Sequence, residues 1–390
     1  MTASRTNRRW IIFLLKKKEN DYYTYPHGAF LDWAVTIHVC IPLAGSDLNW
    51  TGNSLSIGRR RSAVSKQAMT IFGLINKNSG PGFHRIHVPL LLMPEVDVYV
   101  TNAVTEEDFE KRKPDVVFYN RLVSDEVLNL QSKYHFRVVC DVDDYWHLDP
   151  HHIMFKFSKQ NSIPRHQEKN IRSADLVTCT HERLADEAFK LNKNVVVLPN
   201  AIPKNAPDFF PTTRTQSAKG HKRIFWQGSV THEKDLQLLR DTIKKLDKDR
   251  FMMVMVGYAK QIEWERMADC YTNYQKMPGV VFPGTGTETY YHSYQYADVC
   301  VVPLLSTKFN GYKSNLKILE AAHIGLPVIA SNVHPYKGME GVLYVDRKED
   351  WKKWLDDDKA QEESASVLKS YCDKHFDFDK INLKRREVLA

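Results

Sequence analysis

The sequence lacks the features of a secreted or membrane-spanning protein. Its six cysteines form no CxxC pair, and most of them sit in apolar runs, so we expect reduced core thiols in a cytoplasmic protein. The longest apolar run near the start, Trp10–Leu15, is far shorter than the roughly 20 apolar residues of a membrane-spanning helix. We therefore expect no stable membrane insertion, while a peripheral location at a membrane stays open.

Acidic residues are scarce at the beginning of the chain. Residues 1–68 contain ten Lys and Arg but four acidic residues, so they carry +6 of the net charge of +8. The basic character belongs to this segment, which weakens any argument from total charge for binding of nucleic acid by the rest of the chain. The whole chain has 43% hydrophobic and 26% charged residues over 390 positions, which is typical of a soluble globular protein with two domains.

The folded body is predicted to begin at Met69. Residues 44–62 are rich in Gly, Ser, Asn and Arg, which is a loop composition, whereas Thr70–Ile75 has the pattern of a buried strand. We interpret residues 1–68 as a basic extension that is poorly ordered. The alternative is an extra pair of strands on the first sheet.

After Met69, apolar strands alternate with helices. Such an alternation predicts parallel sheets covered on both faces. The segment 203–220 interrupts it with three prolines and many polar residues, as an inter-domain linker does. We therefore predict an α/β fold with two doubly wound, Rossmann-like domains that face a cleft. The predicted segments are an N-terminal domain (69–202), a linker (203–220), a C-terminal domain (221–350) and a helical tail (351–390).

A motif in the second domain suits a phosphate ligand. A strand that ends at Pro303 is followed by a loop with Asn310 and Gly311, and the pattern then predicts a helix over Lys313–His323. Free N–H groups at a helix N-terminus attract anions. Lys313 adds charge, Ser314 and Asn315 add hydrogen-bonding or capping groups, and Glu320 could accept hydrogen bonds from a ribose. An amphipathic helix with a solvated Glu is the alternative.

The stretch 297–331 resembles the nucleotide-sugar motif of retaining GT-B glycosyltransferases, especially glycosyltransferase family 4. Glu320 and the run Gly325–Ser331 match the family pattern E-A followed by G-x-P-V-[IV]-A-S. Tyr312 stands where the family has its first Glu, and Lys313–Asn315 stands where the family has Gly-Phe-Gly. The resemblance implies that this region recognises the donor and that Glu320 binds ribose. It leaves in doubt the contact of the first Glu with the sugar.

A second stretch, 226–235, resembles the family pattern G-R-x-x-x-E-K-G. Gly228 and Lys234 match it, while Ser229 replaces the Arg that helps to hold the donor diphosphate. The resemblance implies that Lys234, Lys313 and Lys317 form the cation set. It covers about residues 69–350 and is stronger in the second domain. The predicted donor-binding residues are Gly228, Ser229, Lys234, Lys313, Ser314, Asn315, Lys317 and Glu320.

Carboxylates follow a buried strand of the first domain at Asp141, Asp143 and Asp144. Ligands bind at the carboxyl edge of such sheets. The favoured role is for Asp143 or Asp144 to bind a sugar or to stabilise positive charge at the anomeric carbon. A D-x-D metal site and simple capping of the next turn are the alternatives. We predict no bound metal.

The segment Gly80–Arg85 places two glycines and a cation after the first strand. By resemblance this loop faces the cleft, so Gly80, Gly82 and Arg85 are assigned to the acceptor cleft. Arg85 is also a catalytic candidate that could bind a phosphate or an acidic group. A plain salt bridge is the alternative for Arg85.

The resemblance implies a retaining, metal-independent enzyme without a cofactor, with a nucleotide-sugar such as a UDP-sugar as its co-substrate. The expected acceptor is a glycan or a lipid-linked precursor. The rival acceptor is a hydroxymethylated base in DNA, which the basic runs Lys16–Lys18 and Arg59–Arg61 could help to bind. A third possibility is a nucleotide-sugar-binding protein without activity.

Overall fold

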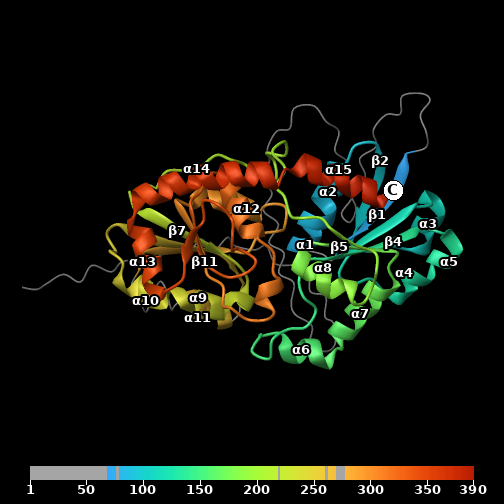
Figure 1. The fold of residues 1–390 in the computed structure, drawn as a ribbon, viewed down its shortest axis with the longest axis horizontal. Coiled ribbons are helices and arrows are strands. Elements are labelled where there is room, and N and C mark those ends of the chain that lie inside the picture. The colour runs from blue at the N-terminus through green and yellow to red at the C-terminus, as the bar shows by residue number, and fades with distance from the viewer. Residues whose placement is uncertain (1–67, 76–78, 218–219, 260–261, 269–276) are drawn as a thin grey trace, which may run out of the picture. The chain divides into compact units, whose positions relative to one another are not determined.

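A computed structural model describes residues 68–75, 79–217, 220–259, 262–268 and 277–390, which all belong to one compact unit of the chain. The predicted extension lies outside the described residues except for its last residue, and so do both of its basic runs. Two parallel sheets of six strands each, with helices around them, organise the described part (Figure 1). This architecture confirms the predicted fold class, whereas the domain boundaries stay predictions.

The first sheet has the strand order β2-β1-β3-β4-β5-β6. All neighbouring strands pair in parallel, and β3 is buried along its whole length, as expected for a sheet that is covered on both faces. The strands are β1 (Met69–Leu74), β2 (Val96–Thr101), β3 (Val116–Asn120), β4 (Arg137–Val142), β5 (Leu176–Cys179) and β6 (Val195–Val197).

Helices connect the strands of the first sheet. They are α1 (Gly80–Gly82), α2 (Val88–Leu91), α3 (Glu106–Arg112), α4 (Asp125–Asn129), α5 (Gln131–Tyr134), α6 (Phe155–Gln160), α7 (Ile163–Ser173) and α8 (Glu182–Phe189). The start of α3 is fixed by a capping box, in which Thr105 and Asp108 each accept a hydrogen bond from the other's backbone N–H.

The glycine loop predicted after β1 is helical in its second half. Residues 76–78 lie outside the described residues, but Ser79 caps α1 by accepting a hydrogen bond from the N–H of Gly82. The helical path then continues through a π-type turn, Phe83–His87, into α2. Pro89 follows this π-type turn directly and does not interrupt the helical path.

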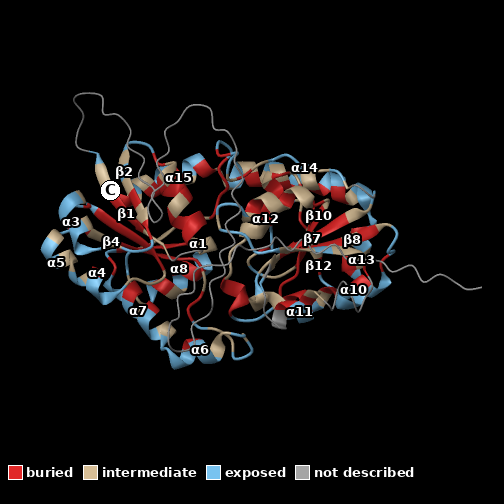
Figure 2. Ribbon diagram, turned by 180° about the vertical axis from the view of Figure 1, so that it is seen from behind, coloured by how far each residue is buried: buried red, intermediate tan, exposed pale blue. Residues whose placement is uncertain are grey.

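The second sheet has the order β12-β11-β10-β7-β8-β9, again all parallel. Its centre is buried, as the red strands of Figure 2 show. The strands are β7 (Lys222–Gln227), β8 (Phe251–Tyr258), β9 (Gly279–Pro283), β10 (Val299–Val302), β11 (Val328–Ser331) and β12 (Leu343–Val345).

The helices of the second half include α9 (Glu233–Leu236), α10 (Arg240–Lys245), α11 (Ile262–Ala268), α12 (Leu316–His323), α13 (Lys348–Asp356), α14 (Asp358–His375) and α15 (Phe378–Leu389), with 3-10 turns at Tyr290–Tyr296 and Asn310–Tyr312. The segment from α9 to α10 is not one continuous helix, because a 3-10 turn separates the two. Among the residues that the structure describes, no helix is both long and apolar enough to cross a membrane.

The last helix returns to the first sheet (Figure 1). Asn382 of α15 donates from Nδ2 to the carbonyl of Pro89 at 2.9 Å, and Arg137 of β4 donates to the carbonyl of Val388 at 2.8 Å. Leu389 is fully buried within the apolar cluster that lies beneath β1 and β3. The chain end is therefore part of the core of the first sheet.

Candidate functional site

Both sheets have a switch point, where the strand order changes direction. These points lie between β1 and β3 in the first sheet and between β7 and β10 in the second. Ligands of doubly wound folds bind beside the carboxyl ends of the strands at such a point. The residues just after these four strands are therefore the first place to look for a site.

A cluster of cations lies at the carboxyl edge of the second sheet. The half-buried Lys317 of α12 has its Nζ 5.6 Å from the ring centroid of Trp226, the penultimate residue of β7. Burial, and next the charge of Lys313, lower the pKa of Lys317 to about 8. Burial and the charges of both lysines lower the pKa of His232 to about 3, so this imidazole is neutral at pH 7.

Lys313 and Lys317 have no salt-bridge partner within the described ranges. Among the residues that the structure describes, no carboxylate forms a salt bridge with Lys313 or Lys317. The nearby carboxylate of Asp235 is engaged elsewhere: Oδ2 pairs with His232 Nδ1 at 2.8 Å, while Oδ1 accepts from Leu305 N at 2.9 Å and Asn310 Nδ2 at 3.1 Å. Two adjacent cations without a paired anion are costly in a half-buried place, and a bound anion would remove that cost.

Sequence reasoning missed His232 and Asp235. The resemblance pointed to the exposed Lys234, which lies between them in sequence. The sequence did contain a signal for Asp235: a carboxylate stands there at the position of the last Gly in the family pattern. The structure thus brings Lys313, Lys317 and His232 together, while the role of the exposed Lys234 stays a prediction.

Three other predicted donor residues have local structural roles or none. The N–H of Gly228 donates to the carbonyl of Val256 at 3.1 Å, and a Cβ there would stand 2.8 Å from the Trp226 ring, so this position requires glycine. Ser229 is exposed and pairs with Thr231. Ser314 is half-buried.

Helix α12 begins at Leu316, later than the predicted Lys313. Asn315 is its N-cap residue, but its side chain makes no capping hydrogen bond, and its Nδ2 instead contacts the sulfur of Met339 at 3.7 Å. The predicted capping role is therefore wrong for this side chain. The later start also places Lys317 in the first turn, where its backbone N–H is free of intrahelical bonds.

Glu320 lies inside the molecule rather than on an open surface. Its carboxylate accepts hydrogen bonds from Tyr290 at Oε1 and from Tyr294 at Oε2, the latter at 2.7 Å. His84 reaches the same carboxylate from the first half of the chain, with Nε2 3.4 Å from Oε1. The alternative of a solvated Glu is excluded, since the residue is 2% exposed.

The first-sheet edge is built around Arg85, which is 1% exposed. It donates to both oxygens of Asp141, with 2.7 Å as the shortest distance, and to the carbonyl of Leu198 at 2.6 Å. The same nitrogen that reaches Leu198, Nη1, also donates to Asn200 Oδ1 at 3.2 Å. Each of the three guanidinium nitrogens thus donates to a partner inside the protein. The structure supports the salt-bridge alternative and corrects the assignment of Arg85 to a phosphate contact.

Packing explains one of the two glycines before Arg85. Gly82 lies in α1, where an added Cβ would stand 3.1 Å from Ile75, the residue after β1. Gly80 is helical as well, with open space around its Cα. The structure therefore places neither glycine in the open loop that the sequence predicted.

Asp143 and Asp144 meet an arginine that sequence reasoning missed. Arg121, the residue after β3, has a left-handed backbone (φ 64°) and binds Asp143 through two donors at 2.6 Å and Asp144 at 2.8 Å. Burial raises the pKa of Asp143, but Arg121 outweighs it and lowers this pKa below its usual value. Asp143 is therefore ionised at neutral pH. Its side chain is 9% exposed and that of Asp144 is 23% exposed, so Asp144 is the more accessible carboxylate.

The D-x-D alternative for Asp141 and Asp143 finds no support in this geometry. Each carboxylate is already bound by an arginine, which leaves few oxygens for a hard cation. Within the described ranges, no group of three or more His, Cys, Asp or Glu is placed to hold a metal ion.

The loop after β10 joins the two edges. Its Phe309 donates from the backbone N–H to Asp149 Oδ2 at 3.0 Å, and Tyr312 stacks on Tyr145 at 4.5 Å between ring centroids. The hydroxyl of Tyr312 donates to Glu187 of α8 at 3.0 Å. The position that holds the first Glu in the family therefore holds an anchor to the first half of the chain.

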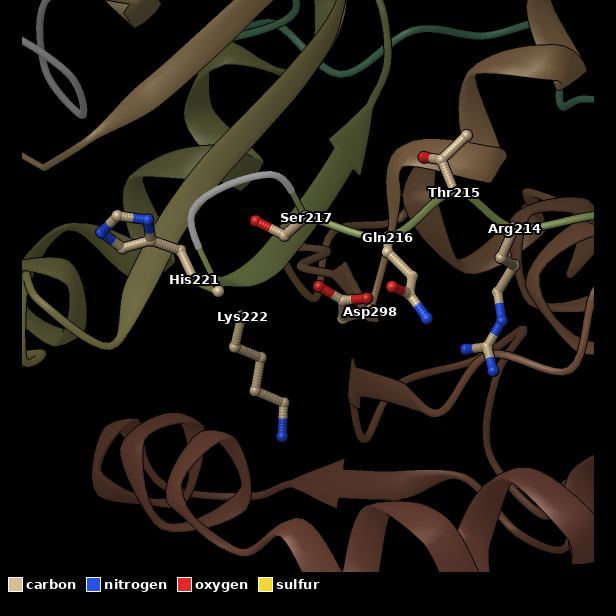
Figure 3. A pocket seen from close by; sticks show the side chains of 8 residues that line it. Arg214, Thr215, Gln216, Ser217, His221, Lys222 and Asp298 are labelled. Carbon is tan, nitrogen blue, oxygen red and sulfur yellow. The ribbon is translucent and has the colours of Figure 1, made fainter.

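A separate hollow of about 670 Å³ lies at the other end of the second sheet (Figure 3). Its lining residues are Arg214, Thr215, Gln216, Ser217, Gly220, His221, Lys222 and Asp298. Lys222 begins β7 and Asp298 precedes β10, so this hollow is at the amino ends of the strands. Asp298 is bound by Arg223 at 2.8 Å. We assign no ligand to it.

Known proteins resemble the chain at two levels. Residues 221–356 match the model of a family described as Glycosyl transferases group 1. No curated protein matches the chain by sequence.

Solved structures share the fold at low sequence identity. Sucrose-phosphate synthase from Thermosynechococcus elongatus is 13% identical, with 82% of this chain and 98% of that chain covered and a TM-score of 0.59. HepE of Anabaena, solved with UDP and glucose, is 13% identical over 83% and 99% of the two chains, with a TM-score of 0.57. An α-glucosyltransferase, solved with UDP and a 13-mer DNA containing an HMU base, is 11% identical over 83% and 100%, with a TM-score of 0.56.

The chain therefore has the GT-B fold. Its second half carries a glycosyl transferase group 1 domain, and on this ground the protein is a glycosyltransferase. The predicted resemblance is confirmed at this level, while the assignment to family 4 stays a prediction.

Proposed function

We propose that this glycosyltransferase uses a nucleoside diphosphate sugar, with UDP as the expected nucleotide, and that the diphosphate binds at Lys313 and Lys317. The observation that carries the proposal is this pair of adjacent cations at the β7–β10 switch point, with which no carboxylate of the described part of the chain forms a salt bridge. The free N–H groups at the start of α12 add hydrogen-bond donors for phosphate oxygens. Two structural neighbours were solved with UDP, which supports the choice of nucleotide.

We place the ribose at Glu320, as the resemblance implies. The residue lies one turn beyond Lys317 on α12, so both side chains project from the same helical face. An ionised carboxylate is a strong acceptor for two hydroxyl groups. The diphosphate and the ribose would then bind to neighbouring turns of one helix.

We propose a retaining, metal-independent transfer. The bond between the sugar C1 and the β-phosphate oxygen breaks, and the acceptor oxygen bonds to C1 on the same face, while its proton passes to the leaving phosphate. Lys313 and Lys317 neutralise the leaving diphosphate, a task that a metal ion performs in other enzymes. Asp144, together with the less exposed Asp143, would stabilise positive charge at C1.

The proposed acceptor is a hydroxyl group of a glycan or a lipid-linked precursor. The rival acceptor is a hydroxymethylated DNA base, and its predicted contacts, Lys16–Lys18 and Arg59–Arg61, lie outside the described residues. If the rival is right, removal of residues 1–68 abolishes DNA binding that weakens with salt. Measurable hydrolysis of the sugar donor would rule out a binding protein without activity.

Thermal unfolding of the full chain with UDP, GDP, ADP, CMP and dTDP, with and without Mn²⁺, tests the donor site. A nucleotide at 100 times its Kd stabilises the fold by about 2.7 kcal/mol. A shift with one diphosphate in the absence of metal supports the proposal. A shift that requires Mn²⁺ contradicts metal independence, and no shift with any nucleotide contradicts the proposed donor.

Paired variants then locate the diphosphate. Lys317→Met should weaken UDP binding about tenfold or more, because it removes a charge-assisted contact. Lys245→Met, an exposed change on α10, is the matched control. If Lys234→Met weakens UDP binding more than Lys317→Met does, the diphosphate is held by Lys234, as the resemblance implies, and the proposed contact with Lys313 and Lys317 is wrong.

A further inference from the structure

Three side chains surround the carboxylate of Glu320. The hydroxyl of Tyr294 donates to Oε2 at 2.7 Å, and the hydroxyl of Tyr290 donates to Oε1. His84, in the helical turn that follows β1, hydrogen-bonds the Tyr290 hydroxyl through Nε2 and lies 3.4 Å from Oε1. Glu320 of the second half of the chain is thereby linked to His84 of the first half.

The two tyrosines differ in how firmly they are held. Tyr294 is 1% exposed and packs on Tyr291 and Phe225, with ring centroids 5.1 and 4.6 Å apart. Tyr290 is half-buried at the edge of the same 3-10 turn. A ligand that approaches Glu320 would therefore displace Tyr290 more readily than Tyr294.

We propose that Tyr290 and His84 form a latch that competes with the donor ribose for Oε1 of Glu320. This inference rests on the proposed function, because it takes Glu320 as the ribose acceptor. When a ribose hydroxyl donates to Oε1, the Tyr290 hydroxyl and His84 Nε2 give up that oxygen. Binding of the nucleotide then breaks the contact between Glu320 and the first half of the chain.

The competition makes a distinctive prediction about affinity. Tyr290→Phe keeps the ring but removes the competing donor, so UDP should bind the variant about tenfold more tightly in titration calorimetry, as expected for a hydrogen bond to a charged group. Tyr291→Phe is the matched control: this hydroxyl donates to the backbone carbonyl of Glu320 at 3.1 Å and does not compete, so its UDP affinity should match the wild type.

The ribose is tested with the diphosphate of 2′,3′-dideoxyuridine. This ligand has no hydroxyl group for Glu320, so Tyr290→Phe should bind it no better than the wild type. His84→Phe keeps an aromatic ring beside Phe210, where the ring centroids are 5.6 Å apart, and should show a smaller gain for UDP, about threefold. This second variant keeps the test informative if Tyr290→Phe folds poorly.

The outcomes separate the latch from the donor site. If the wild type binds UDP and Tyr290→Phe binds it equally or more weakly, the latch is wrong and the donor site stands. An equal gain for the dideoxy ligand also overturns the latch, since the ribose hydroxyls would not be involved. If the wild type binds no nucleotide, the proposed function fails, and the latch fails with it.

Discussion

At the scale of single residues, the site is defined by which charges are paired. Arg85 and Arg121 each hold carboxylates of the first sheet, whereas no carboxylate among the described residues forms a salt bridge with Lys313 or Lys317. Paired charges stabilise a fixed geometry, and unpaired ones are available to a ligand. This difference separates the structural cations from those that we assign to the donor.

The lowered pKa of Lys317 predicts how nucleotide binding depends on pH. With a pKa of about 8, Lys317 is protonated below pH 8 and neutral above it, and only the protonated form attracts a diphosphate. Affinity for UDP should therefore be highest below pH 8 and fall as the pH rises towards 9.5. Titration calorimetry in buffers with different ionisation enthalpies would detect the proton that binding takes up.

Lys317→Arg provides the control for this titration. Arginine keeps its charge across the same range, so the affinity of the variant should not fall between pH 7.5 and 9.5. The same fall in the variant would assign the titration to another group.

Removal of one partner of the buried Arg85–Asp141 pair should be strongly destabilising. Both residues are almost completely buried, and Arg85→Leu would leave Asp141 with neutral donors, among them Thr178 at 2.7 Å. We expect a loss of about 3–5 kcal/mol in the free energy of unfolding, measured by urea denaturation. A loss below about 1 kcal/mol would mean that the pair contributes little to the fold.

At the scale of elements, the loop after β10 links the two sheets. Phe309 is 5% exposed and packs into the apolar cluster of the first sheet, although it belongs to the second half of the chain. Tyr312 also packs into this cluster, and its hydroxyl donates to the carboxylate of Glu187. This loop is held by apolar contacts, and its energetics can be tested without any ligand.

Phe309→Ala should destabilise the protein by about 3–5 kcal/mol, because it leaves a cavity in the first-sheet cluster. Tyr312→Phe is the mild counterpart: it removes one hydroxyl but keeps the stacking on Tyr145, so its cost should be about 1 kcal/mol. Urea denaturation compares the two variants. Equal costs would indicate that the apolar contact of Phe309 does not anchor the loop.

At the scale of the molecule, α15 makes the chain end part of the first sheet. Leu389 is fully buried there, whereas Leu383 on the same helix is 52% exposed. Leu389→Ala should therefore cost about 2–5 kcal/mol of stability, while Leu383→Ala should stay within about 0.5 kcal/mol of the wild type. Similar effects of both changes in thermal or urea unfolding would contradict the packing of α15 on this sheet.

The sequence by itself determined the architecture and the region of the site. Nearly continuous apolar runs such as Val116–Asn120 must be strands of a buried parallel sheet, and the helix that contains Lys317 and Glu320 follows directly from local pattern. Tertiary structure decided which side chains meet. Arg85 turned out to be paired with Asp141, and Arg121 was found beside Asp143, because strands distant in sequence bring these residues to one edge. Local pattern contains no information about such partners, so the enclosure of Glu320 by Tyr290 and His84 became visible only in three dimensions.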